Sequence, residues 1–361
     1  MSPPSHARAL TVVLCLTLAL SIAAPPSLRA QDSRPSALSQ SAPAQSAAAS
    51  GDPDYADGRK LAESGKYDDA LSKLREIQAK DPKAKGLDHE FGVVYYKQGK
   101  YTDAIASLQK ALAADSADNE ATQLLGLSYY LAGHQAEAIP YLEKVQSWLP
   151  RANVDATYVL GVCYIQAKDY PKARSAFARM FDVPPDSAAA YLFTARMMTR
   201  QEFDPVAEEY VLKATTLDPK LPGAHLLLGE LYLAKSRLPE AVEQFQKELS
   251  LNPSSAVTLY KLADAYSRDQ KYDEAERLLQ RSIWLDQNST GPYIMMGKVL
   301  EKKGEFELAA RTLRRAATMD PNNAMTHHLL GEAYREMGMK EDAARELKEA
   351  QRLRNEQESR P

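Results

Sequence analysis

The sequence predicts an all-α fold, an α-α superhelix in which nine helical hairpins stack on one another as a solenoid. The main observation is an alanine that recurs every 34 residues, with a single interval of 35. A fixed period of this length is the signature of a repeat architecture. Glycines and prolines recur in register with the alanine, which supports the same period. The alanines are Ala70, Ala104, Ala138, Ala173, Ala207, Ala241, Ala275, Ala309 and Ala343.

The period divides the chain into nine repeats, which form a predicted solenoid over residues 54–357. Asn153 is an insertion between the third and fourth repeats and accounts for the longer interval. A single hairpin cannot bury its apolar stripe alone, so neighbouring repeats must stack to form a continuous core. The predicted repeats are 51–84, 85–118, 119–152, 154–187, 188–221, 222–255, 256–289, 290–323 and 324–357.

Residues 1–30 have the features of a Sec-type signal peptide. His6 and Arg8 precede an apolar run over 10–24, and we expect cleavage after Ala30. The run is shorter than the roughly 20 residues that a membrane-spanning helix needs. This length favours removal of the signal peptide by cleavage. The alternative is that the segment is retained as an uncleaved signal anchor. We therefore expect a periplasmic or secreted protein.

The segment 31–53 is composed mainly of Ser, Ala, Pro and Gln, with almost no large apolar side chain. Such a composition cannot bury enough surface to offset the entropy of ordering the chain. We expect a disordered linker between the signal peptide and the repeats.

The charge balance and the cysteine content limit the classes of partner and chemistry that the protein can have. The chain has 45 Lys and Arg residues against 48 Asp and Glu residues, without a long run of either sign. This balance argues against nucleic acid as a partner, because phosphate binding needs a concentrated positive field. After signal cleavage one thiol would remain, Cys163, which we expect to be a small packed hydrophobe.

Two sets of glycines and one set of prolines occupy fixed places in the repeat. At the eighth place, in the first helix of the hairpin, a missing Cβ lets the second helix approach closely. At the fifteenth place, just after that helix, glycine permits a left-handed conformation. Proline at the eighteenth place starts the second helix, where its missing N–H has no cost. The eighth-place glycines are Gly58, Gly92, Gly126, Gly161, Gly229, Gly297 and Gly331. The fifteenth-place glycines are Gly65, Gly99, Gly133, Gly304 and Gly338, and the eighteenth-place prolines are Pro171, Pro205 and Pro239.

The fifth repeat departs from this pattern. It has Thr194, Ala195 and Met198 where the other repeats favour Leu, Gly and Tyr. Together with the insertion at Asn153, this predicts a change in superhelical pitch or local opening within 150–205.

The repeat resembles the tetratricopeptide repeat, whose pattern is Leu-Gly-x-x-Tyr in the first helix, Ala-x-x-x-Phe in the second, and a closing proline. The resemblance covers nearly all of the chain after the linker. It rests on Leu125-Gly126 with Tyr129, Leu160-Gly161 with Tyr164, Leu228-Gly229 with Tyr232, Leu330-Gly331 with Tyr334, Ala173 with Phe177, Ala241 with Phe245, and Pro82, Pro150, Pro185, Pro219, Pro253 and Pro321.

We find no motif for catalysis, a metal or a cofactor. Six residues separate Gly92 from Gly99-Lys100, where a phosphate-binding loop has four between its glycines. His327 and His328 are adjacent on a helix and point in different directions, so they cannot jointly bind a metal. We expect a solvated surface pair there, and a protein that is not an enzyme and has no small-molecule substrate.

The resemblance implies that the first helices line an inner, concave surface at the second, fifth, ninth, twelfth and thirteenth places of each repeat. In this chain those places are mostly apolar and aromatic in the second to fourth repeats and become charged toward the C-terminus, as at Lys298 and Glu332. An apolar stripe can also be core, which is the alternative. The predicted groove residues are His89, Val93, Tyr96, Gln123, Leu127, Tyr130, Tyr158, Val162, Ile165, Leu192, Arg196 and Arg200.

These observations predict a non-catalytic scaffold in the cell envelope that binds extended or helical segments of other proteins in an apolar groove. The Lys/Asn clamp by which some family members bind chaperone tails is missing here. One alternative is a structural subunit or assembly factor of a secretion, pilus or polysaccharide-export machine. Another is a repeat arm for an enzyme on a separate chain.

Overall fold

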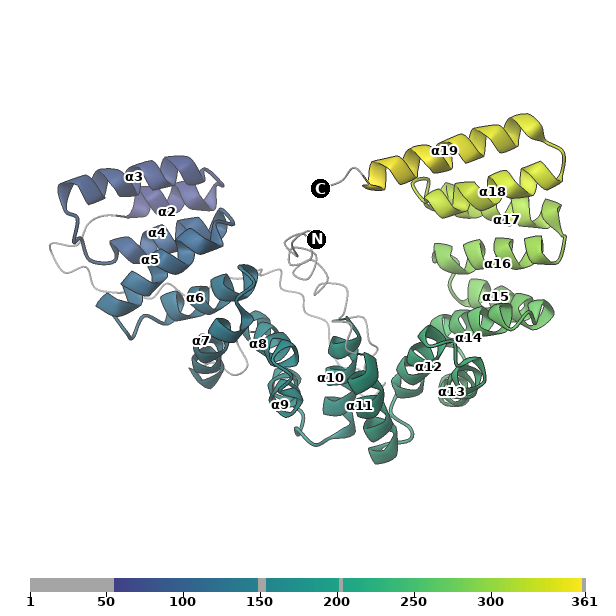
Figure 1. The fold of residues 1–361 in the computed structure, drawn as a ribbon, viewed down its shortest axis with the longest axis horizontal. Coiled ribbons are helices and arrows are strands. Elements are labelled where there is room, and N and C mark those ends of the chain that lie inside the picture. Colours follow the sequence, from purple (N-terminus) through teal and green to yellow (C-terminus); the bar gives the residue numbers. More distant parts are fainter. Residues whose placement is uncertain (1–54, 149–153, 201–203, 359–361) are drawn as a thin grey trace, which may run out of the picture. The chain divides into compact units, whose positions relative to one another are not determined.

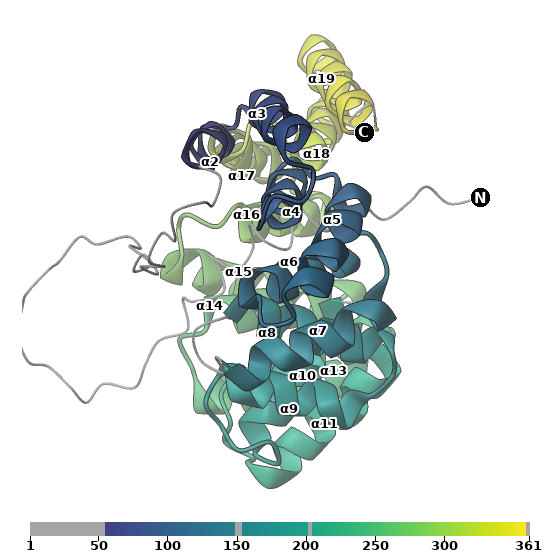
Figure 2. The same cartoon turned by 90° about the vertical axis from the view of Figure 1, so that its left-hand side faces the viewer.

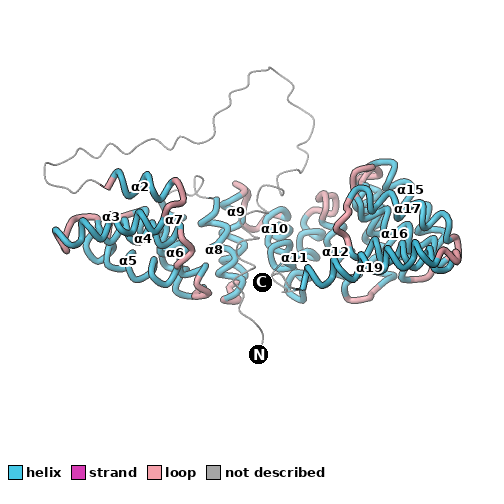
Figure 3. Tube along the Cα trace, turned by 90° about the horizontal axis from the view of Figure 1, so that it is seen from above, coloured by secondary structure: helices cyan, strands magenta, loops and turns pink. Residues whose placement is uncertain are grey.

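The computed structural model describes residues 55–148, 154–200 and 204–358. The predicted signal peptide, the predicted linker and Asn153 lie outside these ranges. Within them every regular element is an α-helix, and Figure 3 shows these helices joined by short loops. The predicted all-α fold is confirmed.

The structure divides into two compact units between Met180 and Phe181. The described part of unit 1 contains four successive hairpins, which Figures 1 and 2 show from purple to teal. Its helices are α2 (Ala56–Glu63), α3 (Tyr67–Lys80), α4 (Leu87–Lys97), α5 (Tyr101–Ala114), α6 (Asn119–Leu131), α7 (Gln135–Trp148), α8 (Val154–Gln166) and α9 (Tyr170–Met180).

Unit 2 contains five hairpins in its described residues. Its helices are α10 (Ala188–Arg200), α11 (Asp204–Leu217), α12 (Ala224–Ala234), α13 (Leu238–Leu251), α14 (Ala256–Arg268), α15 (Tyr272–Leu285), α16 (Thr290–Lys302), α17 (Phe306–Met319), α18 (Ala324–Glu336) and α19 (Lys340–Glu358).

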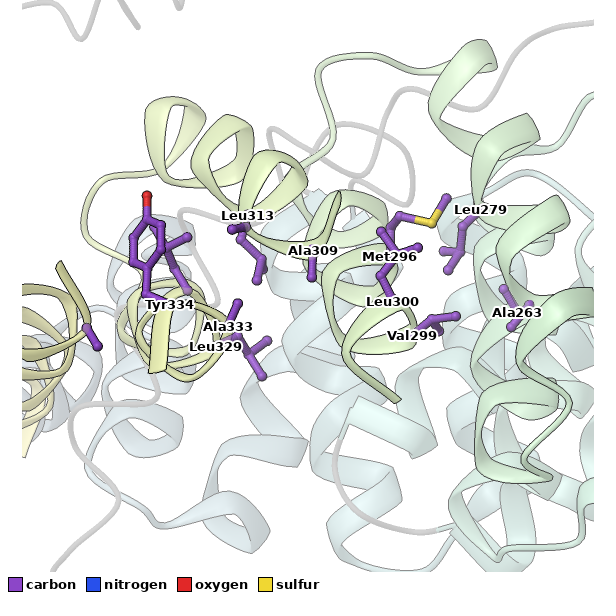
Figure 4. Packing of buried hydrophobic residues seen from close by; sticks show 14 residues of the cluster. Ala263, Leu279, Met296, Val299, Leu300, Ala309, Leu313, Leu329, Ala333 and Tyr334 are labelled. Carbon is purple, nitrogen blue, oxygen red and sulfur yellow. The ribbon is translucent and has the colours of Figure 1, made fainter. Parts of the chain in front are cut away.

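Two helices form each hairpin, and the second helix also packs against the first helix of the next hairpin within the same unit. All nine alanines that define the period are buried at these contacts. A small side chain is needed there because it lets the two helices of a hairpin pack closely. The larger apolar residues fill the space around it, as Leu279, Met296 and Leu313 do in unit 2 (Figure 4).

The glycines at the eighth place lie against the second helix as predicted. A Cβ on Gly161 would lie 2.5 Å from Phe177 Cε1, and one on Gly297 would lie 2.4 Å from Leu313 Cγ. Gly58 is different, because a Cβ there would lie 3.6 Å from Leu74 Cδ2, an ordinary contact. The first hairpin is therefore less tightly packed at this place.

The glycines at the fifteenth place all have the left-handed conformation that was predicted, with φ between 76° and 86°. In the described residues, three repeats have another residue at this place, and the backbone has the same conformation there. Lys168, Ser236 and Gln270 have φ values of 60°, 58° and 60°. The turn geometry is therefore imposed by the hairpin, whether or not glycine is present.

The fifth repeat packs its unusual residues inside unit 2. Thr194, Ala195 and Met198 are all buried, and Thr194 Oγ1 donates a hydrogen bond of 2.7 Å to the Ala190 carbonyl oxygen. The boundary between the units falls within 150–205, the segment where the sequence departs from the repeat. The expected change in pitch or local opening stays a prediction.

Candidate partner-binding surface

The first helices of successive repeats contact one another in each unit. In unit 1 the contacts join α2 to α4, α4 to α6 and α6 to α8; in unit 2 they join α12, α14, α16 and α18 in the same way. They form a layer of their own within each unit. We call the surface of this layer that faces away from the second helices the inner face. The predicted groove residues of unit 1 lie on α4, α6 and α8.

The accessible part of the predicted groove in unit 1 lies on α4 and α6. Val93, Tyr96, Gln123 and Tyr130 are half-buried, so part of each side chain reaches solvent. Leu127 lies between them and is buried. Burial raises the pKa of Tyr130 to about 12, with a smaller contribution from Tyr158. Its hydroxyl is therefore neutral at physiological pH and able to donate a hydrogen bond.

The structure places the α8 residues of the predicted groove in the interior. Tyr158, Val162 and Ile165 are 6%, 1% and 0% exposed, and the Tyr158 ring centroid lies 6.3 Å from that of Phe177. Phe177 is a core residue of the same hairpin. These side chains pack against their neighbours, so Tyr158 is buried instead of lining an accessible groove as the sequence predicted.

His89 lies at one edge of this surface between two carboxylates. Its Nδ1 lies 2.6 Å from Asp118 Oδ2 and its Nε2 lies 3.6 Å from Glu120 Oε2. Burial lowers the pKa of His89, but the interactions with Glu120 and Asp118 outweigh it and raise the pKa to about 9. His89 is therefore a cation at neutral pH.

A pocket of about 230 Å³ adjoins His89 and Val93. Arg59 and the buried Glu90 also line this pocket, and Arg59 Nε donates a hydrogen bond of 2.8 Å to Glu90 Oε1. The pocket has room for one side chain. Its lining residues are Arg59, Ala62, Glu63, His89, Glu90, Val93, Val94, Lys97 and Glu120.

Sequence reasoning missed Arg59, Glu90, Asp118 and Glu120. The signal that was available is the spacing, since Arg59 and Glu90 are 31 residues apart, close to one repeat. Charged residues one period apart lie on adjacent hairpins, so such pairs can be looked for directly.

In unit 2 the three predicted residues are all on α10. Leu192 is buried, Arg196 is half-buried and Arg200 is exposed. Farther along the chain the inner face is charged, as predicted, and its charges form local ion pairs. These are Lys261 with Glu230 at 2.9 Å, Arg268 with Asp264 at 3.0 Å and Arg335 with Glu332 at 3.0 Å.

The prediction of a solvated histidine pair is wrong. His327 and His328 are both half-buried, and His327 Nδ1 lies 2.8 Å from Glu346 Oε2 while its Nε2 lies 2.9 Å from the Pro321 carbonyl oxygen. The sequence could not show this, because Glu346 comes from the second helix of the hairpin. Cys163 is buried as expected, and burial raises the pKa of its thiol to about 12.

The described residues contain neither a metal-binding cluster nor a membrane-spanning helix. No cluster of three or more His, Cys, Asp or Glu side chains in this part of the chain has an arrangement that could hold a metal ion. Among the helices from α2 to α19, none combines the length and the apolar character that crossing a bilayer requires.

Family models match the chain in four segments. Three models described as tetratricopeptide repeat match residues 61–127, 221–288 and 294–358. A fourth, described as subunit 3 of the anaphase-promoting complex or cyclosome, matches residues 97–180. Together the three tetratricopeptide-repeat models span more than half of the chain. No curated protein sequence matches it.

Solved structures give similar alignments over about half of this chain. MamA from Desulfovibrio magneticus RS-1 is 19% identical with a TM-score of 0.45, over 48% of this chain and 98% of that one. PilF from Pseudomonas aeruginosa is 21% identical with a TM-score of 0.46, over 55% and 91%. YrrB, described as a tetratricopeptide-repeat protein with an unusual peptide-binding site, is 22% identical with a TM-score of 0.43, over 51% of this chain and 93% of that one.

The repeat period, the buried alanine in each hairpin, the close glycine contacts and the family matches all agree. The chain belongs to the tetratricopeptide-repeat family.

Proposed function

We propose that this protein is a non-catalytic interaction scaffold that binds an extended or helical segment of a partner protein on the inner face of unit 1. The observation that supports this most is the group of half-buried side chains on α4 and α6, which are Val93, Tyr96, Gln123 and Tyr130. Stacked helical repeats present extended surfaces of this kind for binding.

The chemistry of these residues suits a peptide segment. Tyrosine offers a rigid apolar ring at low entropic cost, and its hydroxyl can pair with the main chain of a partner. The Tyr96 ring is already oriented by an edge contact with Tyr101, with 6.1 Å between the ring centroids. A surface that is ordered before binding loses less entropy on binding.

We also propose that the protein acts in the periplasm or outside the cell. The support for this is the sequence of residues 1–30 alone, with its apolar run and the expected cleavage after Ala30. An uncleaved signal would instead tether the repeats to the membrane.

The test is quantitative capture of partners from an envelope extract. A Tyr96→Ala/Tyr130→Ala variant should bind the main captured partner at least about tenfold more weakly than the wild type, since aromatic anchors commonly contribute about 2 kcal/mol each. Tyr158 is left unchanged because its ring is part of the interior. A Lys298→Ala/Glu332→Ala variant is the matched control and should retain capture, because it removes surface charges in unit 2, and such charges contribute little to binding.

A second candidate function is a structural subunit that uses the outer surface, formed by the second helices. Trp284 on α15 is 75% exposed, and a pocket of about 440 Å³ in unit 2 has the exposed Leu212 and Leu251 on its rim. Exposed apolar groups of this size often mark interaction sites. This candidate predicts that Trp284→Ala reduces capture while the double tyrosine variant does not, which would overturn the inner-face proposal.

A further inference from the structure

Two arginines lie one turn apart on α10, at the predicted groove places of the fifth repeat. Arg196 is half-buried and Arg200 is exposed. Residues four apart on a helix lie on the same face. Within the described part of the chain, neither guanidinium has an ion pair or a hydrogen bond.

The carboxylates whose charge acts on Arg196 already have other partners. Glu248 is buried and accepts hydrogen bonds from the main-chain N–H groups of Gly223 at 2.8 Å and Leu226 at 3.2 Å. Glu230 forms an ion pair of 2.9 Å with Lys261. Glu248 and Glu230 are therefore already bonded to other groups, and the N–H donors of the Arg196 guanidinium are not used by either carboxylate.

The backbone leaves room for the Arg196 guanidinium. A Cβ on Gly223 would lie 2.4 Å from Arg196 Nη2, and Gly223 has a φ of 78° at the start of α12. The guanidinium thus lies against main chain, where water reaches it poorly. Burial lowers the pKa of Arg196, and the charge of Arg200 adds to this effect. A partly desolvated cation without an ion pair is costly, and an incoming anion would relieve that cost.

We propose that Arg196 and Arg200 bind two acidic side chains of an extended segment of the partner protein. This inference goes beyond the proposed function, which concerns the inner face of unit 1, because α10 belongs to unit 2 and the acidic segment is one that unit 2 binds. Guanidinium groups pair with carboxylates through two parallel hydrogen bonds, which gives both strength and direction.

Geometry fixes the spacing of the acidic residues. Four residues of helix place Arg196 and Arg200 about 6 Å apart along the helix axis. In an extended chain, side chains two residues apart lie on the same side and about 6.8 Å apart. An acidic pair separated by one residue therefore fits both arginines, whereas adjacent acidic residues point to opposite sides. A polyanion such as nucleic acid is disfavoured, because the whole chain has a net charge of −3.

The test is fluorescence anisotropy with the full chain and labelled decapeptides that are N-acetylated and C-amidated. The probes share an Ala and Leu background and contain Glu-Ala-Glu, Gln-Ala-Gln or Glu-Glu-Ala at the centre. We expect the Glu-Ala-Glu peptide to bind at least about tenfold more tightly than the Gln-Ala-Gln peptide. The Glu-Glu-Ala peptide should bind with intermediate affinity.

Variants assign the effect to the two arginines. Arg196→Gln should reduce the affinity for Glu-Ala-Glu to about that for Gln-Ala-Gln, and Arg200→Gln should reduce it in part. Arg196→Lys keeps the charge and should retain some preference for the acidic peptide. Arg277→Gln removes an exposed arginine from α15, a second helix of the same unit, and should change the affinity less than about twofold.

Equal binding of the Glu-Ala-Glu and Gln-Ala-Gln peptides would overturn this inference, and so would an undiminished preference in Arg196→Gln. Helicity measured by circular dichroism shows whether a variant is folded. The proposed function has its own test in the double tyrosine variant. If that variant loses its partner while the peptides show no acidic preference, only the inference about the arginines fails.

Discussion

Lys168, Ser236 and Gln270 show how strongly the hairpin imposes its turn on single residues. Each has a left-handed backbone at a place where five other repeats have glycine. For a residue with a Cβ this conformation costs about 1 to 2 kcal/mol. The cost is tolerated because the helices on both sides are fixed by packing, so these residues are sites at which the fold can be stabilised.

We predict that Gln270→Gly stabilises unit 2 by up to about 1 kcal/mol, less than the full cost because glycine also makes the unfolded chain more flexible. The measurement is the midpoint of urea unfolding. Gly304→Ala is the matched control with the opposite sign, since Gly304 has a φ of 78° and no atom within 4 Å of an added Cβ. A Gln270→Gly variant that is less stable than the wild type would contradict this account.

The second prediction at this scale concerns the charge of His89. With a folded pKa of about 9 against an ordinary value of 6.5, the charged imidazole stabilises the folded state. This contribution is complete below pH 6.5 and is lost as the pH rises through 9. The shift corresponds to about 3 kcal/mol, reduced to about 1 to 2 kcal/mol by solvent around the exposed Glu120.

An NMR titration of the His89 ring should therefore have a midpoint about two pH units above that of an unperturbed histidine. Asp118→Asn and Glu120→Gln should each lower the midpoint, because each removes a carboxylate that favours the charged ring. A wild-type midpoint near 6.5 would show that the two carboxylates do not hold the ring as described.

At the scale of the helical hairpin, the eighth-place glycine decides how closely two helices approach. We predict that Gly161→Ala destabilises unit 1 by about 2 to 3 kcal/mol, because the added Cβ would lie 2.5 Å from the buried Phe177 ring. Gly58→Ala makes the same chemical change where the nearest atom is 3.6 Å away. It should be neutral or stabilise by up to about 1 kcal/mol through helix propensity. The comparison of the two unfolding midpoints is the measurement, and equal effects would refute the packing argument.

The elements that the sequence predicted correctly are those that depend on local periodicity. In the described ranges, each alanine of the period lies in the second helix of a hairpin, and the glycines at the fifteenth place lie in the turns of five of these hairpins. Pro171 and Pro239 fall at the second residue of α9 and α13, as expected for helix starts. These features recur along the chain, so several repeats independently support the same assignment of helices and turns.

The features that the sequence could not predict depend on which residues meet across hairpins. The place within the repeat put Tyr158 on the groove, yet its ring packs against Phe177. His89 meets Asp118 and Glu120, about 30 residues away. Burial at a given place differs between repeats because the neighbouring side chains differ, and the repeat pattern alone does not contain that information.

At the scale of the whole molecule, stability in a stacked repeat protein is approximately a sum of repeat and interface terms. The fifth repeat has the least typical sequence, with Met198 and Thr194 in place of Tyr and Leu. We predict that amides in 188–221 exchange with solvent earlier than those in the second, third and sixth repeats, measured by hydrogen exchange with mass spectrometry. Uniform protection over the described repeats would contradict this.

The central claim is that partners bind the inner face of unit 1. Site-specific photocrosslinking in intact cells tests it most directly, with a photoreactive phenylalanine analogue placed at Tyr96 or Tyr130. The controls are Lys110 and Lys144, which are exposed on the second helices α5 and α7. We predict that the same partner crosslinks from the positions of Tyr96 and Tyr130 and not from those of Lys110 and Lys144. Crosslinks from the two lysine positions alone, or from none of the four, would contradict the claim.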